Sequence, residues 1–316
     1  MSKRVEVSIN NWVPFGMTRE ACNALVDGIP SYMESSLLDW LNSAEVLLCG
    51  GYVIPSRPEV GRRHQLINRF DRQTRRLSGL YGNDIYDATS EMEELGDICL
   101  QYVDFLIHEL CELRDAPYYA SMWEVKDFNK IEPCLDELER ILAESGSRWK
   151  VGVRNGYEGL EERVDSTMQT MADDVMEKTD ETSARLLSEA WHALFGRNPD
   201  YSKAYTTAIK AVETIAAPMV SPKNSRYTLS SLAKEMREQK WGFEIEPNPD
   251  GAVEGGIAQV MMNAMMYSHS DRHPANGVED GVKEIVKEHA EAAVYSAVYL
   301  VQCFKSGLVL SPKGKE

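Results

Sequence analysis

Apolar side chains recur every three or four residues along most of this chain, which is the spacing of helices that bury one face. In the first half the pattern begins at Ser31 and is interrupted by glycines, prolines and short polar stretches. The helices that it predicts there cover residues 31–49, 59–80, 84–114, 134–145 and 160–181. Strand-like alternation is confined to short segments, so we predict an all-α fold.

The second half of the chain predicts five further helices, which together would make one compact helical domain. Their predicted bounds are 187–195, 201–216, 229–240, 251–268 and 282–304. Thr228 is a suitable N-cap for the third of them, because its hydroxyl can accept a hydrogen bond from a backbone N–H of the first turn. The second carries small residues that allow close helix packing, namely Ala204, Ala208, Ala211 and Ala216.

Breaks in the pattern divide the 316 residues into an arm and two helical domains. Residues 1–30 are the predicted arm, in which alternating apolar residues over 5–9 favour a short edge strand. A second alternation, over 149–153, predicts a small strand or hairpin. We therefore predict a helical N-terminal domain over 31–180, with its last helix as a connector, and a helical C-terminal domain over 181–316.

The composition narrows the classes of partner and cofactor. There are 50 acidic and 34 basic residues, a net charge of −16, so nucleic acid is not the expected partner of the surface as a whole. No run of about 18 apolar residues predicts a membrane span, and the cysteines have neither zinc nor disulfide spacing. Phosphate-loop and dinucleotide-binding motifs are lacking, so we predict no metal, no cofactor and a location in the reducing cytoplasm.

One segment departs from this acidic character. The predicted helix 59–80 has only two acids, Glu59 and Asp71, and six arginines. The arginines are Arg62, Arg63, Arg69, Arg72, Arg75 and Arg76. A charge run of this kind is commonly a solvated helix face, and the functional alternative is a stripe that binds anions, RNA or a protein partner.

The densest group of titratable side chains lies in the polar loop before the last helix and consists of His269, Asp271, Arg272 and His273. Two imidazoles can act as general base and general acid, an arginine can hold a phosphate, and an aspartate can orient an imidazole. These groups could suffice for cleavage of a phosphodiester. The alternative is structural, since such residues also form caps and turns in loops.

Several ordered motifs in the second half are similar to a known family. They are AWHALFGRNPDYSKAY at 190–205, AIKAVE at 208–213, DRH at 271–273 and AAVYSAVYLVQCFKSG at 292–307. In combination they resemble the abortive-infection protein C-terminal domain, which looks like a relative of the HEPN superfamily, over about 183–312. The resemblance implies an all-α bundle that is often dimeric and associated with phage defence. In many relatives it also implies RNA cleavage without a metal.

The histidine motif departs from that family. The related ribonucleases separate an arginine from a histidine by about four to six residues, whereas Arg272 and His273 are adjacent and Pro274 follows them. Another pair, Arg185 and His192, has the wider spacing and would share one helix face, although it lies in the first helix of the predicted domain.

Two functional hypotheses follow. The first is a helical interaction or sensor protein of the abortive-infection type that acts through a partner and without catalysis. The alternative is a HEPN-like metal-independent ribonuclease, with Arg272 and His273 as the site and the arginine-rich helix as an RNA guide. We also predict a homodimer, because the last helix carries apolar residues on more than one face, namely Ala292, Val294, Ala297, Val298 and Val301.

Overall fold

The computed structural model describes residues 15–18, 20–21, 24–49, 58–80, 92–115, 128–154, 157–179, 181–243, 256–266 and 285–310. Within these ranges the chain forms ten α-helices and two sheets of two strands each, so the all-α prediction is confirmed. No helix in the described ranges combines the length and the hydropathy that crossing a lipid bilayer takes. The predicted edge strand over 5–9 falls outside the described residues.

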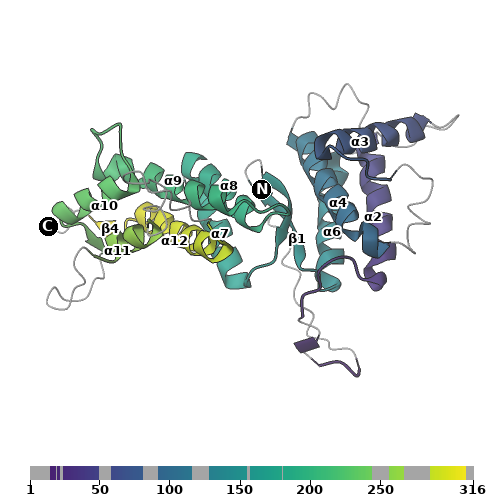
Figure 1. Cartoon of the computed structure of the whole chain (residues 1–316), viewed down its shortest axis with the longest axis horizontal. Helices are drawn as coiled ribbons and strands as arrows, with labels where there is room; N and C mark the ends of the chain where they lie inside the picture. Colours follow the sequence, from purple (N-terminus) through teal and green to yellow (C-terminus); the bar gives the residue numbers. More distant parts are fainter. Residues whose placement is uncertain are drawn as a thin grey trace, which may run out of the picture. The chain divides into compact units, whose positions relative to one another are not determined.

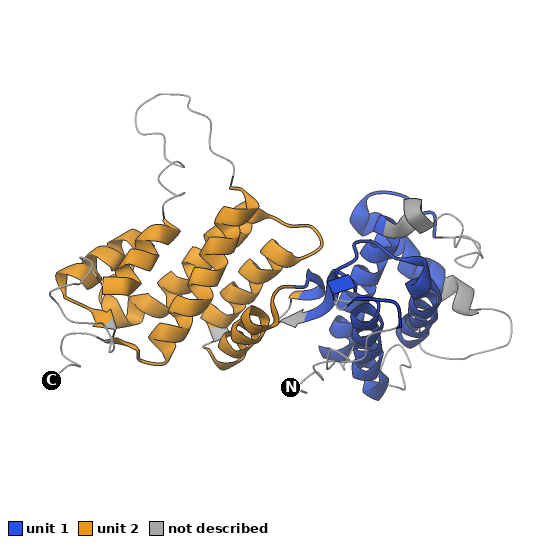
Figure 2. Ribbon diagram, turned by 90° about the horizontal axis from the view of Figure 1, so that it is seen from below, with its two compact units in different colours: residues 1–153, 158–163 blue, residues 154–157, 164–316 orange. Residues whose placement is uncertain are grey.

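The chain divides into two compact units, coloured separately in Figure 2. The first contains residues 1–153 and 158–163, and the second contains 154–157 and 164–316. The boundary between these units lies near residue 163, earlier in the chain than the boundary predicted near residue 180. The reason is packing: the connector helix buries Ala172, Val175 and Met176 in the apolar core of the second unit.

Helices that lie side by side form the core of the first unit. The elements up to the hairpin are α2 (Ser31–Cys49), α3 (Pro58–Thr74), α4 (Met92–Asp115), η2 (Phe128–Lys130), α6 (Ile131–Glu144), β1 (Trp149–Arg154) and β2 (Tyr157–Glu162). Figure 1 shows α2, α4 and α6 side by side, with α3 running crosswise to them. Helix α6 begins at Ile131, so Pro133 lies in its first turn, where a missing N–H costs no hydrogen bond.

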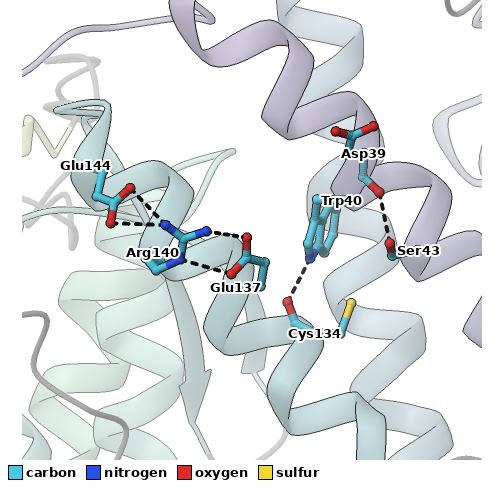
Figure 3. A network of polar contacts seen from close by, with 7 residues as sticks. All are labelled: Asp39, Trp40, Ser43, Cys134, Glu137, Arg140 and Glu144. Atoms are coloured by element: carbon cyan, nitrogen blue, oxygen red, sulfur yellow. Dashed lines mark hydrogen bonds and ion pairs between the residues drawn. The ribbon is translucent and has the colours of Figure 1, made fainter.

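A buried tryptophan connects two of these helices. The indole Nε1 of Trp40 on α2 donates to the backbone oxygen of Cys134 on α6 at 2.8 Å (Figure 3). Farther along α6, Arg140 lies between Glu137 and Glu144 on the exposed side of the helix. The first contact specifies how α2 and α6 pack, whereas the exposed pairs support only α6 itself.

Helix α3 ends at Thr74, earlier than the predicted end at Leu80. The N–H of Arg76 donates to the backbone oxygen of Asp71 at 3.2 Å, which closes the last turn as a Schellman motif does. Arg75 accordingly has a φ of 55°, in the left-handed region that favours glycine. The carboxylate of Asp71 then accepts the N–H of Ser78 at 2.9 Å, which holds the turned chain against the helix.

The hairpin predicted around 149–153 is formed by β1 and β2 and continues to Glu162, so the helix predicted from Leu160 onward begins only at Ser166. Its pairing brings the side chain of Glu161 so close to Gly152 that a Cβ there would lie 2.3 Å from the Glu161 Cδ. The N–H of Leu160 donates to Asp104 on α4 at 2.6 Å, which ties β2 to the helices. At Val26 the arm adds a parallel bridge to Ser147.

Helices α8, α9 and α12 form the centre of the second unit (Figure 1). The elements after the hairpin are α7 (Ser166–Lys178), α8 (Glu181–Phe195), α9 (Tyr201–Val220), α10 (Leu229–Glu238), β3 (Gly242–Phe243), α11 (Gly256–Met265), α12 (Lys287–Lys305) and β4 (Val309–Leu310). The small residues of α9 are fully buried against the neighbouring helices, as close packing requires. Thr228 caps α10 in a capping box with Ser231.

The apolar residues of α12 lie inside their own unit. Val294, Ala297, Val298 and Val301 are all buried in its core, and of the residues used to predict a dimer only Ala292 is exposed. The helix has apolar residues on more than one side because it packs against both α8 and α9. These residues therefore give no reason to expect a dimer, and the homodimer stays a prediction.

Candidate functional site

The predicted catalytic loop lies outside the described residues. His269, Asp271, Arg272 and His273 fall between the end of α11 and Ile285, where the description of the chain resumes. Their role stays a prediction. Other polar groups are brought together within the described residues, among them part of the predicted arginine stripe.

Helix α3 directs part of the arginine stripe into the protein. The Nε atom of Arg63 lies 2.8 Å from the Oε2 atom of Glu45 on α2, and the Glu45 side chain is only 6% exposed. The other oxygen of Glu45 accepts a 2.8 Å hydrogen bond from the hydroxyl of Tyr102 on α4. One carboxylate thus joins three helices.

Burial sets the protonation behaviour of this group. It raises the pKa of Glu45, while the cation of Arg63 and the hydrogen bond from Tyr102 act in the opposite direction. The pKa of Tyr102 is also raised, by burial and by the neighbouring carboxylate, so the phenol stays protonated and remains a donor. Both effects suit a structural contact more than a site of proton transfer.

A second ion pair repeats this arrangement farther along α3. Arg69 bonds to Glu109 on α4, whose side chain is 7% exposed. Burial raises the pKa of Glu109, and Arg69 opposes that shift. Beside the pair, Phe70 packs edge-on against Tyr102 and also contacts Phe105. Two of the predicted anion-binding arginines therefore hold α3 to α2 and α4.

The remaining arginines of the stripe differ from these two. Nothing is described of the side chain of Arg62, whereas Arg72, Arg75 and Arg76 are exposed at the end of α3. Arg76 donates to the side-chain oxygen of Gln101 on α4. The structure thus divides the predicted stripe into two arginines that pair with buried acids and an exposed end.

A polar cluster that includes the Arg185 and His192 pair lies on α8. The carboxylate of Glu189, between them on the same helix face, has its Oε1 atom 3.1 Å from the Nζ atom of Lys203 and its Oε2 atom 3.9 Å from the guanidinium of Arg185. Tyr157 hydrogen-bonds to Glu189, and its ring centroid lies 6.0 Å from that of His192. Five chemically active side chains therefore meet from α8, the start of α9 and the hairpin.

The protonation states of the cluster follow from its contacts. Burial acts to raise the pKa of Glu189, but the hydrogen bonds from Lys203 and Tyr157 outweigh it and hold that pKa below its usual range. Burial and the bond to Glu189 raise the pKa of Tyr157. At neutral pH the cluster offers one carboxylate, a phenol donor, two cations and an imidazole, which could bind an anion and transfer a proton.

The sequence pattern identified only part of this cluster. Glu189 is four residues after Arg185 and three before His192, so helical periodicity alone could have added it. Tyr157 and Lys203 join only through folding, because they belong to other elements. Gly196 supports the histidine: a Cβ there would lie 2.5 Å from the backbone oxygen of His192 and 3.2 Å from its ring.

No metal-binding site is found in the described part of the chain. No group of three or more His, Cys, Asp or Glu side chains within those ranges is arranged to hold an ion. The described cysteines form no disulfide; they are Cys49, Cys99, Cys111, Cys134 and Cys303.

Comparisons of this chain with known protein families, characterised proteins and solved structures find no significant match. The resemblance to abortive-infection domains thus rests on the motifs in the sequence.

Proposed function

We propose that this chain is a cytoplasmic helical interaction or sensor protein of the abortive-infection type, which acts in bacterial or phage conflict through a partner and without catalysis. The observation that carries the proposal is the pairing of Arg63 and Arg69 with buried acids of neighbouring helices. Arginines engaged in this way stabilise the first unit and are not free to guide RNA. The net charge of −16 also favours a protein partner over a polynucleotide.

A metal-independent ribonuclease is the second candidate, and one feature of the second unit favours it. Arg185, Glu189 and His192 share a face of α8, with Tyr157 and Lys203 beside them. A cation to hold a phosphate and an imidazole to move a proton are the minimum for cleaving RNA without a metal. In this alternative the α8 cluster or the loop at His273 would supply the active site.

Incubation of the purified protein with labelled RNA in EDTA separates the two functions. The interaction protein leaves the RNA intact, whereas the ribonuclease cleaves it. If cleavage occurs, its loss in His192→Gln assigns the site to α8 and its loss in His273→Ala assigns it to the loop. His289→Ala is a matched control, because His289 is exposed on α12 and away from both groups in sequence.

Each variant is also examined by circular dichroism, so that loss of structure is not mistaken for loss of activity. Cleavage by the wild-type protein that disappears in one histidine variant of native helicity overturns the non-catalytic proposal. Intact RNA, with all proteins folded, supports it.

A further inference from the structure

The exposed end of α3 has an unusual composition for this protein. Arg72, Arg75 and Arg76 all lie on the surface there, and within the described residues neither Arg72 nor Arg75 has an ion-pair partner. Asp71 lies next to them, but it is buried and occupied by the N–H of Ser78. The first unit therefore presents a concentrated positive charge on a chain whose net charge is −16.

At residue 75 the backbone conformation is one that favours glycine over arginine. Arg75 occupies the left-handed position of the Schellman motif, where helices ordinarily place glycine because a Cβ is strained there. Gly146 and Gly307 take the same conformation after α6 and α12, whereas α10 places Lys240 there. An arginine held in this conformation projects a cation at a strained position, and strain of this kind concentrates at binding sites.

An apolar side chain completes the surface. Leu77 is 85% exposed and directly follows the arginines, although other leucines of the first unit, such as Leu37 and Leu106, are fully buried. Cations near the end of a helix can be explained by the helix dipole, but an exposed leucine cannot. Arginine is enriched where proteins bind one another, and an exposed apolar side chain beside it adds surface that can leave water on binding.

We propose that Arg72, Arg75, Arg76 and Leu77 form a docking surface for an acidic segment of a protein partner that also carries an apolar side chain. The inference rests on the proposed function and names the surface through which it would operate. Charge complementarity selects the partner, because three exposed arginines lie within five residues at this end of α3, and the acid next to them, Asp71, is buried. A polynucleotide fits less well, since three arginines within two turns can neutralise few phosphates and Leu77 has no role in such contacts.

Fluorescence anisotropy with synthetic probes tests the surface directly. The probes are a labelled peptide of repeating Glu-Leu-Asp-Ser, the same peptide with serine in place of leucine, and labelled oligouridylate of equal length. The full-length variants are Arg72→Glu combined with Arg76→Glu, and Leu77→Ser. The matched control is Lys234→Glu combined with Arg237→Glu, which makes the same change of charge on exposed residues of α10 in the other unit.

Wild-type protein is expected to bind the leucine-bearing peptide. The double arginine variant should weaken that binding by about tenfold or more, since two charge-assisted contacts are reversed. The control variant should leave it within about twofold, and Leu77→Ser should remove the preference for the peptide that contains leucine. Circular dichroism confirms that each variant folds.

Three results would overturn the proposal. They are no binding of the peptide by the wild-type protein, equal loss in the arginine variant and its control, or tighter binding of oligouridylate that is lost in the arginine variant. The last result would assign the surface to nucleic acid. Failure here is distinct from failure of the proposed function, because RNA cleavage in EDTA is measured on the same preparations.

Discussion

The two units differ in what they bury. Among the described residues, all the buried acids lie in the first unit, namely Glu45, Asp71, Glu109 and Glu161. The buried polar residues of the second unit are neutral, and its core consists of alanines and other apolar side chains around Trp191. The first unit thus positions a helix through charge, whereas the second positions its helices through close packing.

The two ways of positioning a helix require different side chains. Helix α3 is strongly polar, and Ile67 and Phe70 are its only buried apolar residues within the described range. Its ion pairs with α2 and α4 add specificity of position, because a buried carboxylate without its partner is costly. Helix α9 needs no such pairs, since its alanines let α8 and α12 approach closely.

Removal of the central tryptophan should have the largest effect. Trp191 is fully buried and contacts Phe195 and Tyr295, with ring centroids at 4.7 and 6.1 Å. Trp191→Ala is expected to lower the free energy of unfolding by about 3–5 kcal/mol through lost burial and a cavity, measured by urea denaturation. Trp191→Phe should cost less. A cost below about 1 kcal/mol for the alanine variant would contradict a packing-based second unit.

Breaking one ion pair tests the first unit. Arg63→Ala leaves Glu45 buried without its cation and should cost about 1–3 kcal/mol, less than for a fully buried pair because Arg63 is 28% exposed. The exposed Arg72 provides the control, and Arg72→Ala should change stability by no more than about 0.5 kcal/mol. Equal costs in the two urea titrations would mean that Arg63 is only a surface charge.

The pH dependence of stability should reveal the carboxyl of Asp104, a partly exposed residue on α4. Burial raises its pKa from 3.8 to about 6, although the N–H of Leu160 and the nearby His108 oppose the shift. The folded protein then holds this proton more tightly than the unfolded chain, so the contribution of Asp104 is present at low pH. It is lost as the pH rises from about 3.8 to about 6. Asp104→Asn should remove that fall from urea midpoints measured across this range.

Glu189 in the second unit supplies the opposite case. Its pKa is held below the usual value by Lys203 and Tyr157, so its contribution is present at neutral pH and is lost as the pH falls through its folded pKa. Glu189→Gln should therefore weaken the protein at neutral pH and lessen its loss of stability in acid. Identical pH profiles for the Asp104 and Glu189 variants would contradict both assignments.

The smallest expected effect compares the same backbone feature in both units. Arg75 ends α3 and Lys240 ends α10 in the left-handed conformation, with φ values of 55° and 58°. Arg75→Gly and Lys240→Gly should each raise the unfolding free energy by about 0.5–1 kcal/mol, because glycine adopts this conformation without strain. Alanine at either position should give no such gain. A gain at Lys240 alone would show that other contacts hold the backbone of Arg75.

Local sequence patterns were sufficient to predict most of the helices. The spacing of apolar residues predicted α2 up to Cys49, and the small residues of α9 predicted its close packing. Thr228 was recognisable as a cap because capping depends on only a few neighbouring residues. These features are properties of a short stretch of chain, so the sequence alone determines them.

Tertiary structure decided where elements end and which charges meet. Leu77 and Leu80 extend the apolar spacing past Thr74, yet the Schellman turn and the contact of Asp71 with Ser78 stop α3. Residues 157–162 pair as a strand with β1, and α7 joins the second core. The partners Arg69 and Glu109 lie 40 residues apart, and Tyr157 reaches Glu189 from another element. Periodicity reports on neighbours within a turn or two, whereas these contacts exist only after distant segments have packed together.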